Sequence, residues 1–261
     1  MSKIIILGSG AAPGVPSLAC GFGDCDSNNP KNIRLRSGTY LEINNIKFLI
    51  DTSPDLRQQL INANIRDIDA VFYTHTHADH LHGIDDLREI NRITNKAIEL
   101  YASKDNLKII RTRFPYLIAE DVNNIEPIYR AALHPNTFEY NQSFYYKDLK
   151  ITPIKLIGHN VENSGYIFND GEVVHISDCR EIPDEAFEQI KRQPEVLIVP
   201  LTTPRGTRFH IGLDGVLEYI EKINPKRAII NHMAVECDYK KIYSNCPSNA
   251  EPAYDGLSIT W

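Results

Sequence analysis

Three histidines and an aspartate fall within six residues directly after an apolar stretch, and this spacing constrains the fold more than any other feature. The apolar stretch, residues 68–73, has the composition of a buried β-strand, and the cluster follows it as His-x-His-x-Asp-His over residues 75–80. Apolar residues then recur at helical spacing, which predicts a helix over 81–93. Ligands of open α/β sheets bind beyond the carboxyl ends of the strands. The sequence therefore predicts an α/β protein with a ligand site at this strand end.

The chemistry of the cluster indicates a metal site. Neutral imidazoles together with a carboxylate suit zinc, manganese or iron, and the aspartate argues against a purely thiolate site. Three later residues, His159, Asp178 and His232, each follow the end of another apolar run. With the first cluster they supply five histidines and two aspartates, which is enough for two metal ions about 3.5–4 Å apart.

The cluster is the signature of the metallo-β-lactamase superfamily, and the sequence resembles a member of it. The resemblance implies a four-layer αβ/βα sandwich, in which two mixed sheets lie face to face with helices outside. This is an α/β fold (α+β in some schemes), and we expect residues 1–261 to form one such hydrolase domain. It also implies the distribution of the ligands. One metal would bind His75, His77 and His159, the other Asp79, His80 and His232, and Asp178 would bridge them.

Within the superfamily the chain is similar to the PhnP-type group, whose best-known member is a phosphoribosyl cyclic phosphodiesterase. The similarity rests on the segments 8–16, 32–36, 74–80 and 83–88, on Ser177-Asp178, and on Asn231-His232-Met233 with Asp238-Tyr239. It implies a dinuclear metal-dependent hydrolase, a phosphodiesterase of small substrates that include cyclic ones, in which a metal-bridging hydroxide attacks phosphorus. Zinc or manganese is the expected metal, with iron as a further candidate.

Two residues are expected to take part in the reaction itself. Asp79 is assigned to the catalytic set as well as to the metal ligands. His210 matches a histidine that relatives place beside the metals, where an imidazole can bind the phosphate or protonate the leaving alkoxide. A surface histidine is the alternative at that position. His82, Arg88 and His175 are weaker candidates, to which we assign no role in the reaction.

Other functions stay open on the same motif. A tRNA 3′-processing nuclease has the same metal-ligand motif. The net charge of this chain is −6, however, whereas most nucleic-acid-binding proteins are basic. A thioester or lactone hydrolase could use the same metals. A protein of another class, which binds a nucleotide or a metal without catalysis, is the remaining alternative. We therefore expect a small phosphodiester or nucleotide-like substrate as the partner, rather than nucleic acid or a membrane, and leave a homodimer open.

The cysteines and the glycine-rich turn after the first strand indicate where in the cell the protein is expected and which further cofactors it is expected to bind. Five cysteines without a signal peptide indicate reduced thiols and a cytoplasmic protein. Relatives often bind a structural zinc through C-x-C-x-x-C and a later histidine. Here Cys20 and Cys25 match, but Phe22 and Val235 occupy the other two places, so an ordinary loop is expected. No organic cofactor is expected, because prolines interrupt the glycine-rich turn after the first strand.

The sequence also predicts the local structure of two segments outside the histidine cluster. Residues 114–148 contain three prolines, and we interpret them as an irregular insertion that either covers the site or forms a surface hairpin. A helix is predicted over 183–192.

Overall fold

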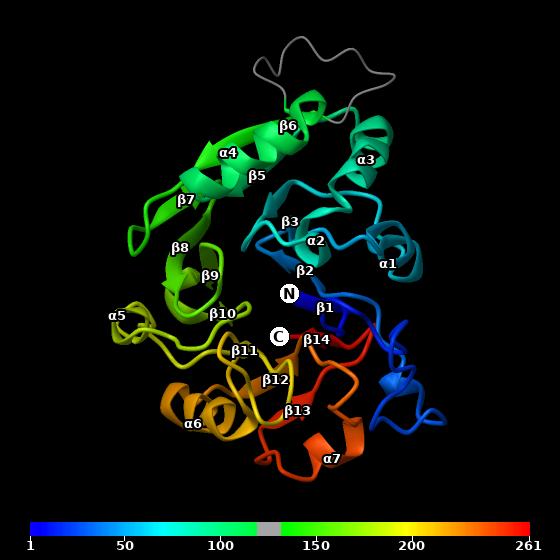
Figure 1. Ribbon diagram of the computed structural model, residues 1–261. Coiled ribbons are helices and arrows are strands. Elements are labelled where there is room, and N and C mark those ends of the chain that lie inside the picture. Colours follow the sequence, from blue (N-terminus) through cyan, green and yellow to red (C-terminus); the bar gives the residue numbers. More distant parts are fainter. Residues whose placement is uncertain (119–131) are drawn as a thin grey trace.

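The computed structural model describes residues 1–118 and 132–261, and it confirms the predicted sandwich of two mixed sheets with helices outside (Figure 1). Within these residues each sheet has seven strands. The first sheet has the order β14-β1-β2-β3-β4-β5-β6, with β1 Lys3–Gly8, β2 Gly38–Ile43, β3 Ile46–Ile50, β4 Ala70–Phe72, β5 Ile98–Ala102, β6 Leu133–Thr137 and β14 Ser258–Thr260. The second has the order β13-β12-β11-β10-β9-β8-β7, with β7 Phe144–Tyr146, β8 Leu149–Leu156, β9 Asn163–Phe168, β10 Val173–His175, β11 Val196–Pro200, β12 Arg227–Asn231 and β13 Ala250–Pro252.

The helices divide between the two outer layers (Figure 1). Those beside the first sheet are α1 Leu56–Asn62, α2 Ala78–Leu81, α3 Leu87–Thr94 and α4 Lys104–Arg113. Those beside the second are α5 Asp184–Phe187, α6 Leu213–Ile223 and α7 Tyr239–Tyr243. Short 3₁₀ helices cover Pro30–Asn32, Ile84–Asp86, Pro115–Leu117 and Asn169–Gly171.

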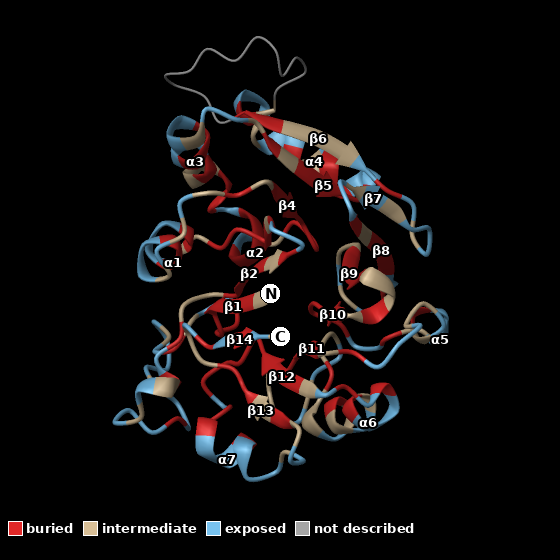
Figure 2. Ribbon diagram, turned by 180° about the vertical axis from the view of Figure 1, so that it is seen from behind, coloured by how far each residue is buried: buried red, intermediate tan, exposed pale blue. Residues whose placement is uncertain are grey.

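Alternation along the strands builds two separate apolar layers. In β1, Ile4 and Ile6 belong to the core between the sheets, whereas Ile5 and Leu7 pack in the cluster under the helices. This is the period of two that a strand imposes when both its faces are covered. Between the sheets, the rings of Phe48 and Phe168 lie 5.0 Å apart. Figure 2 shows most of the strands as buried and the outer faces of the helices as largely exposed, whereas the edge strands β6 and β7 are mostly intermediate or exposed.

The helix predicted over 81–93 is divided into three pieces. Residues 78–81 form α2, a 3₁₀ turn follows, and α3 begins at Leu87. The break lies at Gly83, whose N–H donates to the Thr52 carbonyl over 2.9 Å. A Cβ at Gly83 would lie 1.9 Å from the Ser53 carbonyl oxygen, so only glycine allows this close approach. The tertiary contact therefore replaces continuation of the helix.

Two other expectations were wrong in their extent. The described parts of 114–148 contain β6 and β7, which are edge strands of the first and second sheet, rather than irregular chain. The central residues 119–131 lie outside the described residues, and with them the question of a lid. The helix predicted over 183–192 is only the four-residue α5, because the Lys191 N–H donates to the Asp170 carbonyl instead of continuing the helix.

No helix in the described ranges combines the length and the apolar character needed to cross a membrane.

Candidate metal centre

The site lies where the carboxyl ends of strands from both sheets meet. β3 runs parallel to β4, and β10, β11 and β12 run parallel to one another. The chain after β4 carries His75, His77, Asp79 and His80, while Asp178 follows β10 and His232 follows β12. His159 lies in the turn that follows β8. The fold therefore brings together all seven residues predicted as metal ligands.

One donor set consists of three histidines. Nδ1 of His77 lies 3.1 Å from Nε2 of His75 and 3.0 Å from Nε2 of His159. Two of these three histidines are partly accessible, so the set is open on one side. Three nitrogen lone pairs converge here, as they do around one zinc ion.

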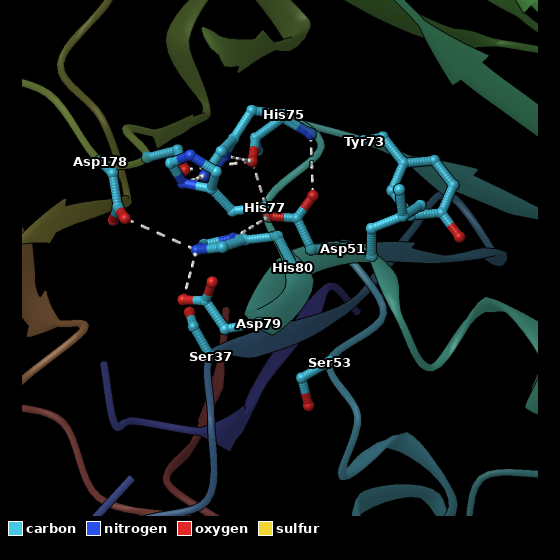
Figure 3. Close-up of polar contacts among 12 residues, drawn as sticks. Ser37, Asp51, Ser53, Tyr73, His75, His77, Asp79, His80 and Asp178 are labelled. Atoms are coloured by element: carbon cyan, nitrogen blue, oxygen red, sulfur yellow. Dashed lines mark hydrogen bonds and ion pairs between the residues drawn. The ribbon is translucent and has the colours of Figure 1, made fainter. Parts of the chain in front are cut away.

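The second donor set is more deeply buried and contains Asp79, His80, Asp178 and His232. Nε2 of His80 lies 3.3 Å from Asp79 Oδ2, 3.6 Å from Asp178 Oδ2 and 3.3 Å from Nε2 of His232. Nε2 of His232 lies 3.4 Å from Asp79 Oδ2 and 3.2 Å from Asp178 Oδ2. Figure 3 shows His80 between the two carboxylates.

These separations fit a divalent metal ion. Ligand atoms at about 2.0–2.1 Å from one tetrahedral ion lie about 3.3–3.4 Å apart, which is close to the values of the second set. Nitrogen lone pairs and carboxylate oxygens at such distances repel one another unless a cation or a proton lies between them. The donor chemistry of both sets is that of zinc, manganese or iron.

Hydrogen bonds on the far side of the imidazoles direct their free nitrogens into the site. Nδ1 of His80 lies 2.7 Å from Oδ2 of Asp51, and Nδ1 of His75 lies 2.9 Å from the Thr74 hydroxyl. The Thr74 hydroxyl donates to Asp51, so it accepts from His75. Nδ1 of His232 lies 3.2 Å from the Thr202 hydroxyl. With the proton on Nδ1, each Nε2 keeps a lone pair for a metal.

Asp51 belongs to this site, although the sequence analysis assigned it no role. Its carboxylate accepts from the Thr74 N–H over 2.8 Å and from the Thr74 hydroxyl over 2.7 Å, and it also faces His80. Its backbone has φ of +63°, an arrangement that aspartate tolerates better than most residues. The one signal in the sequence is its place directly after the apolar run of β3.

Burial and charge shift the acidities of the cluster in opposite directions. Burial would raise the pKa of Asp79 and of Asp178, but the neighbouring His80 and His232 outweigh it and hold both pKa values well below the usual range. Burial lowers the pKa of His159 to about 4. His80 differs, because Asp79 and Asp51 raise its pKa well above the usual range despite its burial. The carboxylates are therefore ionised at neutral pH.

His210 lies at the edge of the two sets. Its Nε2 is 3.8 Å from Asp178 Oδ2, and its ring centroid is 5.3 Å from that of His159. The side chain is 20% exposed, so it can reach a bound molecule. The Thr207 hydroxyl accepts from the N–H groups of Phe209 and His210, and it lies 3.1 Å from Nδ1 of His210. These two N–H groups use both lone pairs of the hydroxyl, so its proton is donated to Nδ1 of His210. A neutral imidazole that accepts at Nδ1 carries its own proton on Nε2.

The remaining candidates lie outside the two donor sets. His82 is exposed and contacts Phe114, and Arg88 forms an ion pair with Asp85 on the helix surface. Cys20 is exposed, while Cys25 is buried and its thiol donates to the Val235 carbonyl. No cysteine belongs to a potential metal-binding group in the described part of the chain.

Comparisons with known proteins agree with this architecture. The family model described as a β-lactamase superfamily domain matches residues 47–233. A crystal structure of a diphosphatase from the PhnP family is 28% identical, with a TM-score of 0.87 over 100% of this chain and 98% of that one. The structure of human tRNase Z, short form, is 16% identical, with a TM-score of 0.69 over 99% of this chain and 98% of that one, and shows a shared fold.

One curated relative is named as an acyltransferase rather than a hydrolase of phosphorus compounds. The octanoyltransferase of Porphyromonas gingivalis is 28% identical over 257 residues, which cover 98% of this chain and 51% of that protein. The chain spans about half the length of this relative and of a probable RNase of Methanocaldococcus jannaschii, which it also matches.

Proposed function

We propose that this chain, which belongs to the metallo-β-lactamase superfamily and is of the PhnP type, is a dinuclear metal-dependent phosphodiesterase of small, including cyclic, phosphodiesters. The observation that carries the proposal is that Asp178 joins the two donor sets: its carboxylate belongs to the second set and also lies within 4.8 Å of the ligand atoms of His159, from the first set, and of His210. The PhnP-family diphosphatase among the similar structures supports a phosphorus substrate.

The residues divide into two metal-binding groups in this proposal. His75, His77 and His159 would hold one ion, Asp79, His80 and His232 the other, and Asp178 would bind both. Two divalent ions held by these residues would supply positive charge for phosphoryl oxygens and would lower the pKa of a bound water.

Neighbouring side chains orient the imidazole rings that would bind the metals and the substrate. Asp51 and Thr74 fix the ring orientations of His80 and His75, so that the donor atoms are in place before substrate binds. The Thr207 hydroxyl orients His210 with Nε2–H toward Asp178. From that position His210 can bind a phosphoryl oxygen or transfer a proton to the leaving alkoxide.

The first experiment is hydrolysis of bis(p-nitrophenyl) phosphate by the purified chain with and without added manganese or zinc. We expect metal-dependent turnover that falls at least about 10²-fold in Asp178→Ala. Asp184→Ala is the matched control, because that side chain is 93% exposed and pairs with Lys222 at the surface of the second outer layer. Absence of turnover with any metal would contradict the proposal.

A second candidate is hydrolysis of an acyl thioester or ester, which the same metals can support by polarising a carbonyl. The name of the Porphyromonas gingivalis relative favours including it. An octanoyl thioester in the same assay separates the two: turnover of the thioester alone would replace the phosphodiesterase by an acyl hydrolase.

A further inference from the structure

A small cavity lies beside the second donor set, between the two sheets. Its volume is about 10 Å³, and its walls include Asp178, His80 and His232 on the side of the donor set. His175 and Asn231 line it from the second sheet, and Thr39 and Asp51 are among the residues that line it from the first. The side chains of His175 and Asn231 are both more than nine-tenths buried, and the proposed reaction uses neither.

Three buried side-chain atoms on the wall residues have no hydrogen-bond partner within the described residues. They are Nδ1 of His175, Oδ1 of Asn231 and Oδ1 of Asp178. A buried polar atom without a partner costs about 1–3 kcal/mol, and such atoms are rare in native proteins. Three of them on the walls of one cavity indicate that a polar molecule fills it.

We propose that this cavity binds one water molecule, which His175 and Asn231 hold against the Asp178 carboxylate and which thereby positions Asp178 for metal binding. His175 is then a positioning residue, acting through the water. The inference rests on the proposed function, because it takes Asp178 as a metal ligand.

The size and the hydrogen-bonding capacity of the cavity fit one water. A single water needs about 10–15 Å³ and two to four polar partners. The water can donate to the oxygens of Asn231 and Asp178 and accept from an Nδ1–H of His175. Nε2 of His175 then accepts from the Thr39 hydroxyl, which lies 3.5 Å away on the opposite sheet. Burial lowers the pKa of His175 to about 3, which leaves one N–H on its ring at neutral pH.

The consequence for the site follows from the two oxygens of Asp178. Oδ2 faces His80, His232 and His210, whereas Oδ1 is the unpartnered atom. A hydrogen bond to Oδ1 would fix the rotation of the carboxylate and so the place of Oδ2. Hydrogen bonds of this kind to metal ligands change metal affinity by about 10- to 100-fold.

The test begins with a crystal structure of the metal-loaded wild-type protein at about 1.5 Å or better. We expect one water within hydrogen-bonding distance of His175 Nδ1, Asn231 Oδ1 and Asp178 Oδ1. A dry cavity, or a metal ion with an anomalous signal at that position, would overturn the proposal. This measurement needs no variant and no substrate.

Metal affinity of variants tests the consequence. In competition with a chromophoric chelator, His175→Leu should bind zinc about 10- to 100-fold more weakly, and His175→Gln, which keeps a polar atom at the cavity, should recover most of the loss. The matched control is His134→Leu, because His134 pairs with Glu99 at the edge of the first sheet. If His175 had a purely structural role, His175→Leu and His175→Gln would lower the melting temperature equally, and His175→Gln would not recover the zinc affinity. Wild-type affinity in folded His175→Leu would refute the positioning role.

The two proposals fail separately. A wild-type protein that binds metal and holds the water but hydrolyses no phosphodiester leaves this inference intact and removes the proposed function. Turnover of bis(p-nitrophenyl) phosphate with a dry cavity does the reverse.

Discussion

Nδ1 of His80 lies 2.7 Å from Oδ2 of Asp51, and both side chains are almost completely buried. Asp51 directly follows β3, and His80 lies 29 residues later in α2, after β4. The contact therefore joins the segments that follow two neighbouring parallel strands, at the edge where the site lies, and it leaves Nε2 of His80 free to face Asp79 and Asp178.

The first prediction concerns this contact. Asp51→Asn should weaken metal binding by about 10- to 100-fold, because the neutral amide polarises His80 less than a carboxylate does. Asparagine tolerates the positive φ at this position, so the backbone should be preserved. Zinc affinity measured against a chelator checks this, with the partly exposed Asp67→Asn as the control. Equal affinities of the two variants would show that Asp51 does not act on the metal site.

The second prediction is a pH dependence of metal binding. Burial would lower the pKa of His80, but Asp79 and Asp51 raise it well above its usual range, so the metal-free imidazole keeps its proton at pH 7. A metal must displace this proton, and the competition weakens as the pH rises. Affinity should therefore increase from pH 6 to pH 8, by about tenfold per pH unit for each proton released. Calorimetric titration in two buffers of different ionisation enthalpy counts the protons, and a count of zero would contradict the prediction.

The third prediction separates His210 from the metal ligands. His210→Ala should lower turnover by about 10²- to 10⁴-fold, the usual contribution of a general acid, while the metal content stays unchanged. The metal content by elemental analysis is measured on the same sample as the turnover of a cyclic phosphodiester, because its alkoxide leaving group needs a proton, whereas p-nitrophenolate leaves without one. His82→Ala serves as the control, since His82 is an exposed histidine outside both donor sets. Unaltered turnover would remove His210 from the mechanism.

The fold and the donor sets were predictable because their signals are local. The spacing of His75 to His80 is visible in six residues, and each later candidate directly follows an apolar strand. The superfamily resemblance then joined them into one site. The division of the ligands between two ions stays a prediction.

What the sequence did not reveal depends on contacts between distant segments. The role of Asp51 needs a positive φ and a partner 29 residues away. The break at Gly83 follows from its approach to Ser53. Pro135 argued against a strand in 114–148, yet β6 is an edge strand, where proline is tolerated.

The fourth prediction concerns the loop that replaces the structural zinc site of relatives. The purified chain should bind two divalent ions and no third, and Cys20→Ser should leave this stoichiometry unchanged. Cys20 is exposed, and the guanidinium of the buried Arg34 lies 3.9 Å from the Cys25 thiol, where its positive charge opposes a second cation. Elemental analysis after metal loading checks the count. A third ion that is lost in Cys20→Ser would show that the loop binds zinc after all.

The last prediction assigns the stability of that loop to Arg34. Its guanidinium donates to the Cys237 carbonyl over 2.8 Å, to Asn32 Oδ1 over 3.0 Å and to the Ala234 carbonyl over 3.4 Å, and so ties the segment before β2 to the one after β12. Arg34→Met should lower the free energy of unfolding by about 3 kcal/mol, because it leaves several buried acceptors without a donor. Urea unfolding of the metal-loaded protein measures the difference, with Arg92→Met on the surface of α3 as the control. Since the loop would be held by a side chain, removing the metals should lower the stability of wild type and Arg34→Met by the same amount. Unequal losses would mean that the metal sites and the loop are energetically coupled.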